Sequence, residues 1–141
     1  MNIFMAFPKN MLGDAEITQE VRSLFEIANV PATFTHSKDD FRERFHAAGS
    51  WGGWTTDVAM GVEYATRLPR YDIIMCVPMP DTICSVGKAT ADIAKKALQA
   101  RKKVYCYMDT RIQPVMDVVA SDEDNWQTGW RLVIGSIGEV S

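Results

Sequence analysis

The fold is decided by one continuous stretch of the chain, YDIIMCVPMPDTICSVGKATADIAKKALQARKKVYCYM (residues 71–108). Residues 71–77 are apolar at nearly every position, which is typical of a central strand that is buried on both faces of a parallel sheet. After a loop that contains two prolines, apolar residues recur at helical spacing from about residue 85 to residue 101. Residues 104–108 then predict a second strand. This order predicts a right-handed crossover between two parallel strands.

The N-terminal part of the chain predicts two more strands and a helix. Residues 2–7 (NIFMAF) are a short apolar run that Pro8 ends, as expected for a buried strand. Apolar residues at i, i+4, i+7 and i+8 predict a helix over residues 14–29, and Pro31 lies where such a helix should stop. Residues 32–36 (ATFTH) carry the β-branched and aromatic side chains of a strand.

The remaining segments are less regular. We predict a short charged helix over residues 38–46, a Gly-rich irregular loop over residues 49–54 and a further helix over residues 55–68. In the tail, residues 115–119 form a short apolar run, and residues 130–137 predict a last strand.

Together these elements predict a single α/β domain over residues 1–141. Alternating strands and helices favour a three-layer sandwich of Rossmann-like or flavodoxin-like type, with a mostly parallel sheet of four to five strands. We expect residues 2–109 to form this core and residues 110–141 to be a β-rich C-terminal elaboration.

Composition and charge restrict the classes of function. The chain has 15 Lys and Arg against 18 Asp and Glu, a formal net charge of −3, whereas proteins that bind nucleic-acid backbones usually carry a positive excess. No apolar run reaches the roughly 18 residues of a membrane span. We therefore expect neither a nucleic acid nor a membrane as partner. The 3 cysteines show no CxxC spacing, which favours a cytoplasmic protein with reduced thiols and no metal or other cofactor.

The position of a ligand site follows from the predicted sheet. In open α/β sheets, ligands bind beyond the carboxyl ends of the parallel strands. This rule selects three loops, residues 8–14, 37–56 and 78–88, all rich in Gly, Pro, Asp or Ser. Their convergence favours a small-molecule pocket, with Phe7 and Pro8 among the substrate-binding residues. The alternative is a scaffold with unremarkable loops.

The junction between the last of these loops and the following helix predicts an anion site. Ser85 and Gly87 precede a helix N-terminus, where free backbone N–H groups and the helix dipole attract negative charge. Lys88 and Thr90 would add a cation and a hydroxyl group. The alternative is that Ser85 is only an N-cap and Gly87 only a packing position.

Two tryptophans in the Gly-rich loop, Trp51 and Trp54, are a further unusual feature. They could stack on a base or close over the site as a lid. The alternative is a hydrophobic plug against the body of the protein or a subunit contact.

Four segments of the chain together carry a family resemblance: NIFMAFP (2–8), YDIIMCV (71–77), SVGKATADIAKKAL (85–98) and RKKVYCY (101–107). In these segments the chain resembles the nucleoside 2-deoxyribosyltransferase-like superfamily, which includes deoxynucleoside-monophosphate N-glycosidases. The resemblance implies cleavage of an N-glycosidic bond, a nucleoside-like or nucleotide-like ligand and a homo-oligomer. The family has a catalytic Glu early in the helix, where this chain offers Asp92.

Cleavage of an N-glycosidic bond passes through a cationic sugar that a carboxylate stabilises, and a second acid assists the departing base. The candidates for this pair are Asp92 with Asp57, Asp81 or Glu63. Two alternatives remain: a non-catalytic module that sequesters a nucleotide-like ligand, and a protein-interaction domain that uses Trp126, Trp130 and the acidic residues 122–124.

Overall fold

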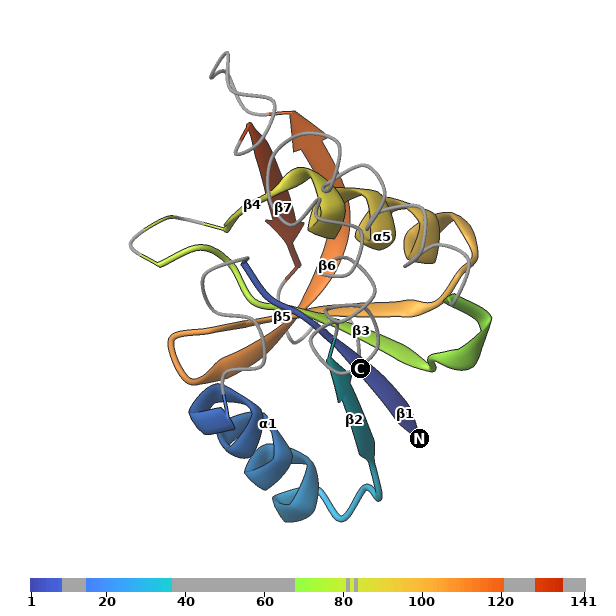
Figure 1. Ribbon diagram of the computed structural model, residues 1–141, viewed down its shortest axis with the longest axis vertical. Helices are drawn as coiled ribbons and strands as arrows, with labels where there is room; N and C mark the ends of the chain where they lie inside the picture. Colours follow the sequence, from blue (N-terminus) through green and yellow to red (C-terminus); the bar gives the residue numbers. More distant parts are fainter. Residues whose placement is uncertain (9–14, 37–67, 81, 83, 121–128, 136–141) are drawn as a thin grey trace, which may run out of the picture.

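The computed structural model describes residues 1–8, 15–36, 68–80, 82, 84–120 and 129–135 (Figure 1). The elements in this part of the chain are β1 (Asn2–Ala6), α1 (Ala15–Ile27), β2 (Thr33–His36), η2 (Leu68–Arg70), β3 (Ile73–Cys76), β4 (Ser85–Val86), α5 (Lys88–Gln99), β5 (Lys103–Met108), β6 (Arg111–Ala120) and β7 (Trp130–Ile134). The short helix and the Gly-rich loop predicted between residues 38 and 54 lie outside the described residues, as does most of the helix predicted over residues 55–68.

The strands of the described segments form one mixed sheet of 7 strands in the order β2-β1-β3-β5-β6-β7-β4. The first four are parallel to one another, as the alternation of strands and helices predicted. The other three pairings are antiparallel, so the prediction of a mostly parallel sheet of four to five strands is wrong. For β5 and β6 the reason lies in their connection, because a strand that returns through a two-residue turn can only pair antiparallel, whereas a parallel strand needs a long crossover.

The two helices α1 and α5 lie on opposite faces of the parallel part of the sheet (Figure 1). Successive residues of a strand point to opposite faces, so each central strand supplies both cores. Phe4 and Ile74 belong to the cluster that includes α5 side chains, whereas Ile3 and Met75 belong to the cluster packed against α1. All 4 residues of β3 are buried, which confirms the prediction of a central strand with two apolar faces.

The helix ends differ by a few residues from the predicted ones. α1 ends at Ile27, and Asn29 just beyond it takes a left-handed φ of 60°, which terminates a helix. α5 starts at Lys88 rather than at Ser85, because Ser85 and Val86 pair with β7 as the short strand β4. A left-handed Arg101, with φ 60°, follows its end.

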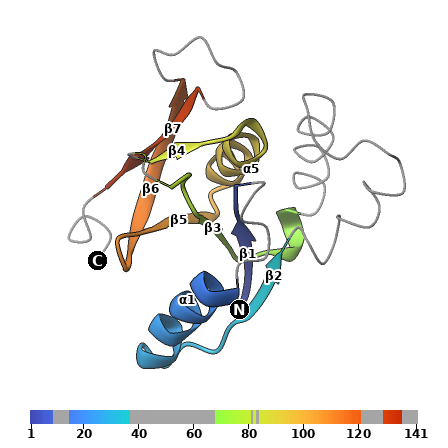
Figure 2. The same cartoon turned by 60° about the vertical axis from the view of Figure 1, so that its left-hand side comes forward.

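Strand β6 joins the two halves of the sheet. Its first residues pair with β5 and its last ones with β7, with an irregularity between Val115 and Asp117. Such bulges bend a strand, and β6 and β7 turn so that Val118 and Leu132 share a core with α5 (Figure 2). The C-terminal strands therefore extend the same sheet. Among the described segments, none of the helices combines the length and the hydropathy that a membrane-spanning helix needs.

Candidate functional site

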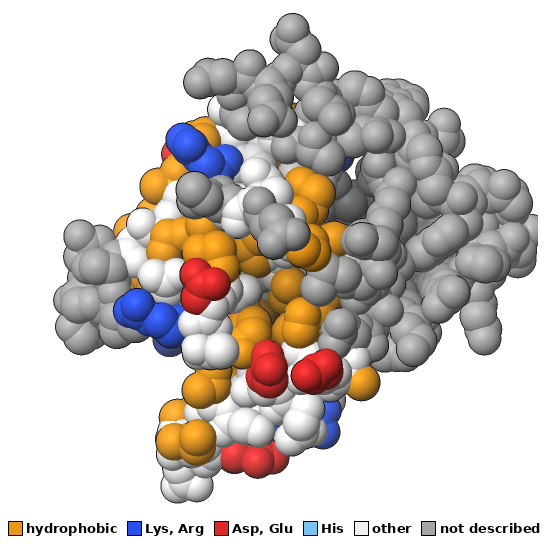
Figure 3. Space-filling model, turned by 90° about the vertical axis from the view of Figure 1, so that its left-hand side faces the viewer, with side chains coloured by type: hydrophobic (Ala, Val, Ile, Leu, Met, Phe, Trp, Pro, Cys, Tyr) orange, Lys and Arg blue, Asp and Glu red, His pale blue; other side chains and the backbone are white. Residues whose placement is uncertain are grey.

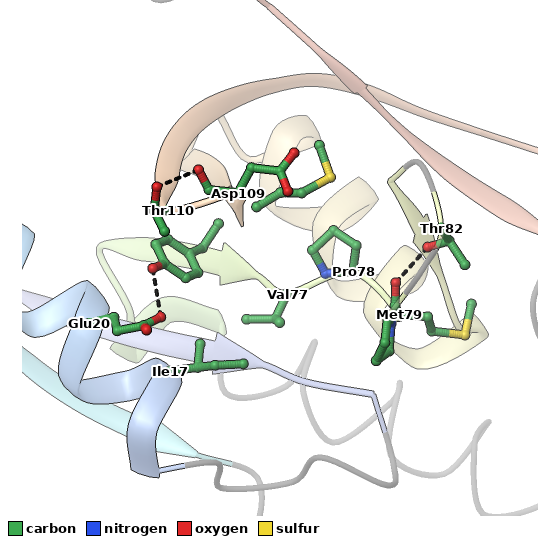
Figure 4. Close-up of a pocket in the computed structure, with 11 residues that line it drawn as sticks. Ile17, Glu20, Val77, Pro78, Met79, Thr82, Asp109 and Thr110 are labelled. Atoms are coloured by element: carbon green, nitrogen blue, oxygen red, sulfur yellow. Dashed lines mark hydrogen bonds between the residues drawn. The ribbon is translucent and has the colours of Figure 1, made fainter.

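A pocket of about 540 Å³ lies at the carboxyl ends of β3 and β5 (Figure 4). Its walls come from three places: Ile17 and Glu20 of α1, the loop after β3 (residues 77–80 and Thr82), and the end of β5 with the following turn (residues 107–110). The volume falls within the range of roughly 300–1,000 Å³ that is usual for small-molecule sites. Of the three loops that the sequence analysis selected, the loop after β3 contributes to this lining.

The loop after β3 is held in place by its own hydrogen bonds. Pro78 has no backbone N–H to continue the β-ladder, so the chain leaves the sheet at this residue. The Met79 N–H then donates to the carbonyl of Ser85 at 2.9 Å, and the Thr82 hydroxyl donates to the carbonyl of Met79 at 2.6 Å. These bonds fix Met79 and Thr82 on one side of the pocket.

The turn between β5 and β6 forms another wall. Met108 pairs with Arg111 across the hairpin, which leaves Asp109 and Thr110 as its two central residues. Both have positive φ, 53° and 61°, as a two-residue type I′ turn requires. Glycine or asparagine usually occupies such positions, and a β-branched threonine there is strained by roughly 1–2 kcal/mol. Asp109 and Thr110 both line the pocket, and the Thr110 hydroxyl donates to the carbonyl of Asp109 at 2.6 Å.

A hydrogen bond between α1 and β5 closes one end of the pocket. The Tyr107 hydroxyl donates to Oε2 of Glu20 at 2.7 Å, and Figure 4 shows Glu20 facing this partner from α1, at the opposite end of the pocket from Met79 and Thr82. Burial raises the pKa of Tyr107 to about 12, and the negatively charged acceptor Glu20 adds to the shift. Tyr107 is therefore a neutral donor at neutral pH, and it leaves the charge of Glu20 in place.

The lining is apolar with acidic groups. Seven of its members are apolar or aromatic, and the acidic ones are Glu20 and Asp109; no Lys, Arg or His occurs among the described lining residues. Figure 3 shows the corresponding face of the molecule, where apolar side chains gather in the centre and acidic side chains lie close to them. The charged side chains of the described lining therefore favour a neutral or cationic ligand over a phosphate.

The residues predicted to bind an anion lie elsewhere. Lys88 and Asp92 form an ion pair within α5, with 2.6 Å between Nζ and Oδ1. The Lys88 and Lys95 ammonium groups lie over the Trp130 ring of β7, at 5.3 and 4.5 Å from its centroid. This cluster on α5 and β7, which includes the predicted catalytic Asp92, contributes nothing to the lining of the pocket.

The structure also separates the other predicted site residues. The N-cap of α5 is Gly87, without a side-chain hydrogen bond, so the alternative that Ser85 caps this helix is wrong. Thr90 is buried, and Phe7 belongs to the core packed against α1. Thr90, Phe7 and Pro8 are all absent from the lining of the pocket. Five predicted residues lie outside the described part of the chain and stay predictions: Trp51, Trp54, Asp57, Glu63 and Asp81.

Sequence reasoning missed Glu20, Tyr107 and Asp109. The signal for Asp109 was present, because it directly follows a predicted parallel strand and so lies at the ligand-binding edge. Glu20 and Tyr107 are far apart in the chain, and only the packing of α1 across β5 brings them together. In the described segments, no group of three His, Cys, Asp or Glu side chains is arranged to hold a metal ion.

We compared the chain with models of protein families, with curated proteins and with solved structures, and none of the three comparisons found a match.

Proposed function

We propose that this protein binds a nucleoside-like N-glycoside in the pocket between α1, β3 and β5 and cleaves its glycosidic bond. The observation that carries the proposal is the Tyr107–Glu20 hydrogen bond of 2.7 Å at the wall of an apolar pocket. It holds a carboxylate in a fixed position beside a surface on which a flat base can pack.

The chemistry needs such a carboxylate. When the bond between the sugar C1′ and the base nitrogen breaks, its electron pair leaves with the base and positive charge develops on the sugar. A fixed carboxylate stabilises that charge, and it does so best where a neutral donor orients it without neutralising it. Glu20 meets this condition through Tyr107. Water then adds to the sugar at C1′, and the proton that it loses goes to the departed base.

We propose the reaction that the sequence resemblance implies, but with Glu20 rather than Asp92 as its carboxylate. Asp92 is engaged with Lys88 on α5, whereas Glu20 and Asp109 line the pocket. The finer fold prediction, a Rossmann-like three-layer sandwich, belongs to the same proposal, and the position of α1 and α5 on opposite faces of the parallel strands supports it (Figure 1).

A second candidate function is binding without cleavage. The observation in its favour is the Lys88–Asp92 ion pair. Asp92 is the carboxylate that the sequence resemblance implies as catalytic, and in this structure Lys88 is bound to it. The same pocket would then sequester its ligand.

The test incubates the full chain with deoxynucleosides, with their monophosphates and with oxidised nicotinamide adenine dinucleotide, and it measures the free base by chromatography. We expect release of free base from the deoxynucleosides. This release should be lost in Glu20→Gln and unchanged in Glu26→Gln, because Glu26 is an exposed acid of α1 that does not line the pocket. Binding without release supports the second candidate. Loss of release in Asp92→Asn but not in Glu20→Gln would return catalysis to α5, and absence of any binding refutes both functions.

A further inference from the structure

The charged side chains of the pocket restrict the class of ligand further than the proposed function does. Glu20 and Asp109 come from different elements, α1 and the β5–β6 turn, and both line the same pocket of about 540 Å³. Neither is paired with a lysine or arginine in the lining, where the described residues include no cation. A ligand that brings its own positive charge is therefore complementary to both carboxylates.

The rest of the lining suits a cation of a particular kind. The phenol ring of Tyr107 and the thioether sulfurs of Met79 and Met108 line the pocket, and aromatic rings and polarizable sulfur atoms interact favourably with flat, charged heterocycles. The prolines Pro78 and Pro80 add apolar surface. A compact, strongly hydrated ammonium ion would lose its water in such a place without enough polar partners, whereas a delocalised cation loses less.

Building on the proposed function, we propose that the ligand of this pocket is an N-glycoside of a cationic heterocycle, such as a pyridinium riboside. The carboxylates of Glu20 and Asp109 supply the charge recognition, and the apolar wall contacts the ring.

This ligand class also simplifies the chemistry. In a pyridinium riboside the ring nitrogen that is bonded to C1′ carries the positive charge. When that bond breaks, its electron pair returns to the nitrogen and the base departs as a neutral molecule without a proton. Positive charge passes to the sugar, where Glu20 stabilises it, and water adds to C1′ and releases one proton to solvent. The described lining offers no histidine, lysine or arginine to protonate a neutral leaving base, and this substrate class needs none.

The test compares two ligands of nearly equal shape, nicotinamide riboside and its uncharged 1,4-dihydro form. Binding of both is measured by isothermal titration calorimetry for the full chain and for the variants Glu20→Gln, Asp109→Asn and Glu26→Gln. A charge-assisted contact corresponds to a preference of about tenfold or more for the cation. We expect that preference in the unmodified protein and in the control Glu26→Gln, and a fall toward equal binding in the other two variants. Circular dichroism establishes that each variant is folded, and Asp109→Asn, on an exposed turn, provides the result if Glu20→Gln unfolds.

The outcomes separate the two proposals. If the dihydro form binds as tightly as the cation, the cationic-ligand inference is overturned, while ribosides remain ligands as the proposed function requires. If 1-methylnicotinamide binds with the expected dependence on Glu20 but no riboside binds, the pocket is a cation site and the N-glycoside function fails. If neither riboside nor any nucleoside binds, both proposals fall.

Discussion

The substitution Tyr107→Phe tests the central contact of the site, because it removes one hydroxyl group and keeps the buried ring. Tyr107 is only 7% exposed, whereas its partner Glu20 lies at the surface. A hydrogen bond to a charged group contributes roughly 1.5–3 kcal/mol, and exposure of the acceptor to water reduces this to about 1 kcal/mol. For a chain of this size the loss lowers the melting temperature by about 3 °C.

The pH dependence of this difference gives a second, independent signal. Because the folded-state pKa of Tyr107 is raised from 10.0 to about 12, its contribution to the free energy of unfolding is complete below pH 10 and is lost as the pH rises toward 12. The stability advantage of the unmodified protein over Tyr107→Phe should therefore be constant from pH 7 to about pH 9.5 and shrink above pH 10. Other groups that titrate at high pH are common to both proteins and cancel in the comparison.

The assay is chemical unfolding in urea, followed by circular dichroism at several pH values, for Tyr107→Phe, Glu20→Gln and the double variant. The double variant should be less destabilised than the sum of the two single ones, because both remove the same bond. Additive effects would refute the assignment of this hydrogen bond. A difference between Tyr107→Phe and the unmodified protein that stays constant up to pH 12 would refute the raised pKa of Tyr107, whose largest cause is burial.

Three further predictions concern the strained turn, the core and the thiols. Thr110→Gly should raise the free energy of unfolding by up to about 1 kcal/mol, because it relieves a positive φ at a β-branched residue and loses part of that gain to the entropy of glycine; a lower melting temperature would contradict this. Ile74→Ala, at a side chain with 0% exposure, should destabilise the protein by about 2–5 kcal/mol in urea unfolding, and an effect below 1 kcal/mol would mean that β3 is not central. Burial raises the pKa of Cys76 to about 12 and also raises the pKa of Cys106, so a thiol reagent at pH 8 should leave both unmodified in the native protein and label them after denaturation; mass spectrometry of the labelled peptides decides this.

The parallel part of the fold was predictable because its signals are local. Two-sided apolar runs such as residues 73–76 occur in strands with neighbours on both sides, and the helical spacing in α1 and α5 places one apolar stripe against each face. A local pattern of this kind does not specify which strands pair with one another. Ser85 and Val86 follow a loop and precede a helix, and only their pairing with Arg131 and Trp130 makes them a strand.

The sequence indicated one segment of the candidate site but not its side chains. The rule that ligands bind at the carboxyl ends of parallel strands points to the loop after β3, which lines the pocket. It does not say which helix lies across the neighbouring strand, and the contact of Glu20 with Tyr107 depends on that packing. The anion site was expected at Lys88, which does not line the pocket. Lys88 instead donates a hydrogen bond to Asp92 of its own helix and lies over the Trp130 ring, and the sequence pattern did not specify this packing.

The pairing of β4 with β7 has a consequence for the order in which the protein folds. The loop after β3 forms one wall of the pocket, and its end is held by β7, where the Leu132 N–H donates to the carbonyl of Cys84 at 2.9 Å. Contacts between distant parts of a chain form late, because they require the closure of a large loop. We therefore expect β3, α5 and β5, which follow one another closely along the chain, to assemble before β1 and β7 join them, so that the pocket becomes competent to bind only in the late steps of folding. Ligand affinity would then report on the completion of folding, whereas helix content would not.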